Sequence, residues 1–123
     1  MSAKKKPATP KGLTRTAARL WRSVTSTYDL RADELRVLED ACYEMALIDF
    51  LEEHRRSDEF ELFVKGSQGQ PVTNPVLAEL RQHRSALRQL LRQLNLPDED
   101  GRAAESRSST ARAAANARWR RSA

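Results

Sequence analysis

Three carboxylates, Asp40, Glu44 and Asp49, are the side chains of this sequence that come nearest to a catalytic set. Carboxylates can hold the divalent ions with which some nucleases cleave phosphodiesters. These three belong to residues 29–63, where twelve acidic residues stand against four basic ones and the net charge is −8. Acids spread around a helix in this way are typical of a solvated face. We therefore expect no catalytic residue here, and a metal nuclease is an alternative.

Other side chains with catalytic or ligating chemistry are few. His54, His83 and Cys42 lack the spacing of a structural metal site. The chain also has no G-x-x-x-x-G-K-[ST] loop to hold the phosphates of ATP. The sequence therefore predicts a protein that is not an enzyme and that takes no cofactor, no metal and no small-molecule substrate.

The single cysteine and the absence of long apolar stretches indicate where the protein resides. Cys42 is the only cysteine, which excludes an intramolecular disulfide and is typical of a reducing compartment. The first residues, MSAKKKPATPKG, lack the apolar region of a secretory signal, and no stretch approaches the ~20 apolar residues of a membrane span. We expect a soluble, cytoplasmic protein without membrane contact.

Basic residues are segregated along the chain. Residues 1–28 contain seven Lys or Arg and no acid, whereas residues 64–96 have a net charge of +4 and residues 97–123 of +2. Cations that neutralise nucleic-acid phosphates gain affinity through released counterions, and such contacts position a protein without reading bases. A merely solubilising tail is the alternative for residues 1–12. We predict that the phosphate contacts are made by the N-terminal basic residues, Lys4, Lys5, Lys6, Lys11, Arg15, Arg19 and Arg22.

Hydrophobic periodicity predicts three helices, over residues 13–27, 33–56 and 75–95. The second has apolar residues on two sides, so we expect more than one neighbour to contact it. Asp29 or Asp33 is its expected N-cap. For the third helix, Asn74 is the expected N-cap and Pro75 the first helical residue.

The predicted fold class is all-α. A short N-terminal helix accompanies a long antiparallel helical hairpin, and residues 13–96 form one helical domain. Residues 57–73, with Gly66 and Gly69 in the turn, form either a small β-hairpin or an extended loop. Residues 1–12 are expected to be a disordered basic arm. Residues 97–123 are expected to be a flexible basic tail, in which residues 108–121 could form a short helix.

The third helix combines an apolar seam with a basic stripe. Leucines recur along it at coiled-coil spacing, Leu80, Leu87, Leu90 and Leu94. Arginines form a second row beside them, Arg81, Arg84, Arg88 and Arg92. This row could bind phosphate, or it could pair with the acidic helix of its own or a neighbouring subunit. We favour pairing, and predict that both rows belong to the interface of a homo-oligomer.

Four segments occur in an order that resembles the small subunits of tailed-phage terminases, in the short form common among phages of actinobacteria. They are GLTRTAARLWRSVTSTYDL, ADELRVLEDACYEMALIDFLEE, VKGSQGQPVTNPVLAELRQHRSALRQLLRQLNLPDED and the terminal ARAAANARWRR. The glycine turn followed by Asn-Pro and an arginine-bearing leucine helix is the most distinctive part. Together the segments cover most of the chain.

The resemblance implies a DNA-packaging factor without catalytic activity. Such proteins recognise the viral genome, assemble into rings and deliver DNA to the large terminase subunit, which holds the ATPase and the nuclease. The implied partners are phage double-stranded DNA, the large subunit and further copies of the chain, in the cytoplasm of the bacterial host. Better-characterised relatives carry a helix-turn-helix domain before the oligomerisation helices, whereas this chain has one clear helix there. A small dimeric helical transcription regulator, with its recognition helix at the join between helices 13–27 and 33–56, is the alternative.

Overall fold

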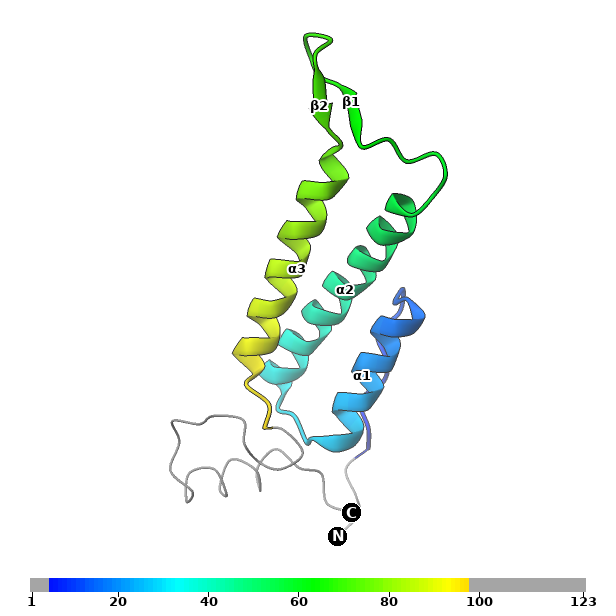
Figure 1. The fold of residues 1–123 in the computed structure, drawn as a ribbon. Coiled ribbons are helices and arrows are strands. Elements are labelled where there is room, and N and C mark those ends of the chain that lie inside the picture. Colours follow the sequence, from blue (N-terminus) through cyan, green and yellow to red (C-terminus); the bar gives the residue numbers. More distant parts are fainter. Residues whose placement is uncertain (1–4, 98–123) are drawn as a thin grey trace.

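The computed structural model describes residues 5–97 of the 123-residue chain. It is mostly helical, as expected, with a small two-stranded sheet (Figure 1). The elements in chain order are α1 (Arg15–Thr27), α2 (Ala32–Arg55), β1 (Phe63–Lys65), β2 (Pro71–Thr73) and α3 (Pro75–Leu94). The three helices begin and end within two residues of the predicted bounds. The predicted helix over residues 108–121 lies outside the described residues.

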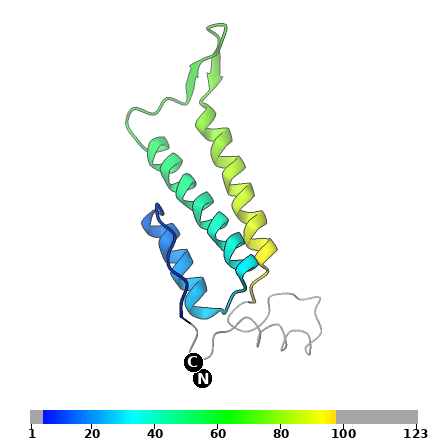
Figure 2. The same ribbon diagram turned by 180° about the vertical axis from the view of Figure 1, so that it is seen from behind.

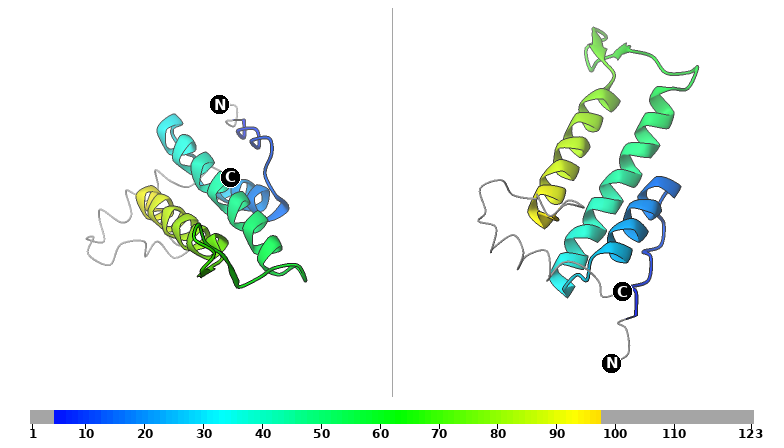
Figure 3. Two further views of the ribbon diagram at one scale, coloured as in Figure 1. Left: turned by 90° about the horizontal axis from the view of Figure 1, so that it is seen from above. Right: turned by 60° about the horizontal axis from the view of Figure 1, so that its bottom comes forward.

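The three helices form a layer with α2 in the middle. Figure 3 shows α1 on one side of α2 and α3 on the other, and both helices make contacts with α2. This arrangement confirms the expectation that the acidic helix has more than one neighbour. α1 accompanies only the first part of α2, so the far ends of α2 and α3 project beyond it and carry the β-hairpin. None of the described helices offers an apolar stretch that could span a lipid bilayer.

The hydrophobic core lies where α1 ends, α2 begins and α3 ends. Trp21 of α1, Leu38 of α2 and Leu94 of α3 belong to one cluster and are almost fully buried. Cys42 is also fully buried in this cluster, as its apolar neighbours in the sequence indicated. Burial, followed by the charge of Glu39, raises the pKa of the Cys42 thiol to about 11. The thiol is therefore a core side chain with little nucleophilic character.

The beginning of α2 differs from the prediction. Its N-cap residue is Arg31, not Asp29 or Asp33. The carboxylate of Glu34, in the first turn, reaches back and accepts a hydrogen bond of 2.8 Å from the backbone N–H of Arg31. The side chain of the third helical residue, Glu34, thus fixes the helix start. The sequence indicated only Asp residues as N-caps of this helix and therefore did not predict this arrangement.

The segment between α2 and α3 forms the predicted β-hairpin. β1 and β2 are antiparallel, and Val64 pairs with Val72 at the middle of the register. Gly69 has a φ of +80°, which an L side chain rarely adopts, so glycine is required at this point of the turn. A Cβ at Gly66 would come within 2.7 Å of the flexible end of the Gln70 side chain, which would have to shift. Phe60, before β1, packs edge-on against His54 at the end of α2.

Both ends of α3 follow from the sequence. The Asn74 side chain accepts a hydrogen bond of 3.0 Å from the backbone N–H of Val76, and Pro75 is the first helical residue, as predicted. The Asn74 amide also donates to the backbone oxygen of Glu61, which ties the helix start to the residues before β1. At the other end, Asn95 adopts a left-handed conformation and ends the helix.

Candidate nucleic-acid interface

The described part of the N-terminal segment, residues 5–12, lies along α1 (Figure 2). The indole N–H of Trp21 donates to the backbone oxygen of Pro7, at 3.5 Å, and Lys6 Nζ donates to Ser26 Oγ, at 3.2 Å. Gly12 then reverses the chain into α1 with a φ of +84°. From Lys5 onward, the segment predicted as a disordered arm thus contacts α1 through one backbone oxygen, that of Pro7, and one side chain, that of Lys6.

The far end of this segment is held by α2. The Tyr43 hydroxyl donates a hydrogen bond of 2.8 Å to the backbone oxygen of Lys11. Backbone contacts at both ends thus position Lys6 and Lys11 while their charged groups stay exposed. The hydrogen bonds could not be predicted from the sequence, because their acceptors are backbone carbonyls whose partners lie far along the chain.

The arginines of α1 form the second part of the basic surface. Arg15, Arg19 and Arg22 follow one another at steps of four and three and are exposed, because Ala17, Trp21 and Val24 turn the opposite side of α1 into the core. α1 contains no acidic residue. Within residues 5–97, none of these three arginines takes part in an ion pair.

The segment and the helix meet around a hollow of about 250 Å³. Lys6 from the segment and Arg22 from α1 both line it, so two cations that are sixteen residues apart in the sequence become neighbours. A guanidinium can bind a phosphate through two parallel N–H groups, and an ammonium acts on it as a compact charge. We define the basic layer as the exposed cations of residues 5–12 and α1, Lys5, Lys6, Lys11, Arg15, Arg19 and Arg22. Lys4, predicted with them, lies outside the described residues.

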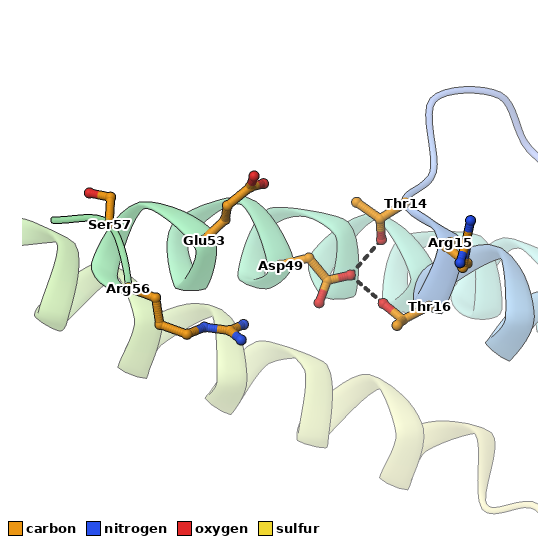
Figure 4. Close-up of a pocket in the computed structure, with 7 residues that line it drawn as sticks. All are labelled: Thr14, Arg15, Thr16, Asp49, Glu53, Arg56 and Ser57. Atoms are coloured by element: carbon orange, nitrogen blue, oxygen red, sulfur yellow. Dashed lines mark hydrogen bonds between the residues drawn. The ribbon is translucent and has the colours of Figure 1, made fainter.

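A second hollow, of about 630 Å³, lies beside the start of α1 (Figure 4). Asp49 of α2 points into this region and accepts hydrogen bonds from the hydroxyls of Thr14, at 2.5 Å, and of Thr16. Thr14 is also the N-cap of α1 and accepts from the backbone N–H of Ala17. Asp49 therefore fixes the end of α1 from which Arg15 projects.

The three carboxylates considered for metal chemistry are engaged in separate contacts. Asp40 pairs with Arg36 at 3.2 Å, and Glu44 contacts His83 of α3 at 2.5 Å. Asp49 is turned toward α1, as described above. The part of the chain that the structure describes contains no group of three or more His, Cys, Asp or Glu side chains that could hold a metal ion. The structure thus does not bring these three carboxylates together.

The leucine seam of α3 is largely used inside the chain. Leu80 and Leu94 have only 2% and 3% of their surface exposed, because they pack within the protomer, and they are not available to a second copy. Leu87 and Leu90 are half-buried. The predicted oligomer interface therefore needs correction at Leu80 and Leu94. The periodicity identified an apolar face of α3 correctly. It did not show that the same protomer, and not a second copy, covers Leu80 and Leu94.

The arginine row of α3 is divided between two environments. Arg84 pairs with Glu52 of α2 at 2.6 Å, and Glu52 also binds Arg55 at 2.7 Å. Hydrogen bonds first from Arg55 and then from Arg84 lower the pKa of Glu52 to about 2. The other three arginines of the row are Arg81, Arg88 and Arg92. They are exposed and form no ion pair with residues 5–97. Pairing with the chain's own acidic helix is thus observed for Arg84.

Comparison with protein-family models, with curated proteins and with solved structures gave no match for this chain.

Proposed function

We propose that this chain is the small subunit of a phage terminase. In this proposal it binds double-stranded viral DNA in the host cytoplasm without catalysing a reaction. It associates with further copies of itself and delivers the DNA to the large subunit that carries the ATPase and the nuclease. The observation that supports the proposal most directly is the basic layer, because six exposed cations lie on residues 5–12 and α1, which contain no acidic residue. Arg15, at its edge, shares a hollow with Asp49 and Glu53 of α2.

The distribution of charge favours a polyanion as the partner of this layer. All seven basic residues of the first 28 residues lack acidic neighbours in that range, whereas the acids of residues 29–63 lie on α2 and in the segments before and after it. A surface of one sign attracts DNA through its phosphates and gives an affinity that depends strongly on salt. If all six described cations of the layer meet phosphates, the logarithmic salt slope is about −5.

The alternative of a dimeric regulator finds less support in the arrangement of the helices. It would place a recognition helix in the major groove after the join between α1 and α2. α2 has α1 along one side and α3 along another, and its remaining side is rich in acids. The basic layer therefore favours contact with the DNA backbone over insertion of α2 into a groove.

The test is DNA binding by the full-length chain with Arg15, Arg19 and Arg22 all changed to Gln. We expect a weaker affinity and a salt slope reduced by about 3, because each lost phosphate contact lowers the slope by about 0.9. Fluorescence anisotropy of a labelled duplex across a salt series measures both quantities.

A matched control removes three exposed cations elsewhere, Arg31→Gln, Arg56→Gln and Lys65→Gln. This variant has the same net charge as the test variant, so any difference between the two reports the location of the charge. If the affinity and the salt slope fall equally in the test variant and the control, or fall in neither, the assignment of DNA binding to the basic layer is contradicted.

A further inference from the structure

The free side of α2 exposes large apolar side chains. Tyr43, Leu47 and Phe50 follow one another at steps of four and three, so they share one face of the helix. Their exposed fractions are 38%, 45% and 70%. Two of these three residues are aromatic, and we call the set the aromatic face. Contiguous exposed apolar residues of this size usually mark a contact surface in a soluble protein.

Acidic residues surround the aromatic face. Glu39 and Asp40 lie one turn before Tyr43, where both also pair with Arg36, at 3.4 and 3.2 Å. Glu53 follows Phe50 by three residues. α2 as a whole contains eight acids and two arginines. A partner that suits this surface needs apolar stems to cover the rings and positive charge to meet the rim.

The three arginines of α3 that have no ion pair within residues 5–97 offer this combination. Arg81, Arg88 and Arg92, which we call the outer arginine row, are exposed, and α3 contains only one acid, Glu79. A guanidinium stacks on aromatic rings and binds carboxylates, and its aliphatic stem covers apolar surface. The chemistry of the outer arginine row is thus complementary to that of the aromatic face.

One copy of the chain cannot bring these two surfaces together. Leu80 and Leu87 turn toward the protomer interior, and Arg81 and Arg88 follow them by one residue, hence about 100° further around α3. On α2, Glu44 and Glu52 contact α3, whereas the aromatic face remains exposed. The two surfaces therefore belong to different sides of the α2–α3 pair, and only a second copy can join them.

We infer that the aromatic face of one copy packs against the outer arginine row of the next. This inference rests on the self-association in the proposed function and identifies the two surfaces that make it. Because the contact joins two different surfaces, each end of a pair retains one unused surface, and assembly continues until it closes on itself. A contact between two copies of the same surface would stop at a dimer.

Two variants of the full chain test the inference, because each removes one of the two surfaces. In the row variant, Arg81, Arg88 and Arg92 are changed to Gln. In the face variant, Leu47 and Phe50 are changed to Lys. All five positions are exposed or partly exposed, and circular dichroism checks that both variants retain their helices. Sedimentation velocity without DNA then gives the mass of each variant alone and of an equimolar mixture.

We expect the parent to exceed the mass of a dimer and each variant alone to sediment at the mass of one protomer. The mixture should sediment at twice the protomer mass and no higher, because the intact aromatic face of the row variant binds the intact arginine row of the face variant. The control with the same net charge as the row variant, Arg31→Gln, Arg56→Gln and Lys65→Gln, should assemble like the parent.

Three results would overturn the inference. They are a row variant that assembles like the parent, two variants that stay monomeric when they are mixed, and a parent that is itself monomeric. All three are obtained without DNA, whereas the basic layer is tested by salt-dependent binding to a duplex. Failure of the assembly contact is therefore distinguishable from failure of the DNA-binding proposal.

Discussion

Glu52 joins the loop-side half of α2 to α3 through two arginines. Its carboxylate accepts hydrogen bonds from Arg55 of the same helix and from Arg84 of α3. A carboxylate held in this way is stabilised in its charged form, so its pKa falls from 4.5 to about 2. The side chain of Glu52 is largely buried, whereas both arginines are partly exposed, so solvent screens part of this stabilisation.

The pH dependence of stability follows from the direction of this shift. Because the pKa is lower in the folded chain, the contribution of Glu52 is fully present above about pH 4.5 and is lost as the pH falls toward about 2. We expect Glu52→Gln to be less stable than the parent near neutral pH, and the difference to shrink on acidification. Urea unfolding at about pH 6 and about pH 3 measures it. The same difference at both pH values contradicts the role of Glu52.

Among the elements, α1 is held at its start by contacts that join distant parts of the chain. Asp49 accepts from Thr14 and Thr16, and Thr14 in turn caps the helix. The periodicity of residues 13–27 predicted the helix and its buried face. The polar contacts at its start could not be predicted in detail, because the sequence does not show which part of α2 faces Thr14.

The same limit explains the other differences between prediction and structure. Period and spacing predicted three helices, the hairpin and the Asn74 cap, because these depend on neighbouring residues. The packing of residues 5–12 on α1 depends on backbone oxygens, and the burial of Leu80 and Leu94 depends on the approach of α2. For the basic layer, the sequence predicted the residues and their charge, but not that Lys6 and Arg22 line one hollow.

A double-mutant cycle tests the attachment of α1. We expect Thr14→Ala and Asp49→Ala each to lower the free energy of unfolding by about 1–2 kcal/mol, because each removes a cap or a hydrogen bond to a charged group. The double variant should lose less than the two single losses together, since both changes break the same contact. Thr27→Ala, at the exposed end of α1, is the control, with a change within about 0.5 kcal/mol. Additive losses in the double variant contradict the contact.

At the scale of the whole molecule, the proposed DNA-binding and assembly surfaces lie mainly on different elements, and they meet where the Tyr43 hydroxyl donates to the backbone oxygen of Lys11. The basic layer occupies α1 and the segment along it, whereas the proposed assembly contact uses the free sides of α2 and α3. An assembly therefore presents several basic layers to one duplex. Several linked layers should bind a long duplex more tightly than one layer does, by a factor of 10² or more.

The face variant, Leu47→Lys with Phe50→Lys, separates this avidity from charge. It adds two positive charges, so simple electrostatics would raise its affinity for DNA, whereas loss of assembly should lower it. On a duplex of about 60 base pairs we expect binding at least 10²-fold weaker than that of the parent. On a duplex of about 10 base pairs, one helical turn of roughly 34 Å, the variant should bind at least as tightly as the parent, because one protomer fills the site. Fluorescence anisotropy at one salt concentration measures both, and equal affinities on the long duplex would show that assembly does not contribute to DNA binding.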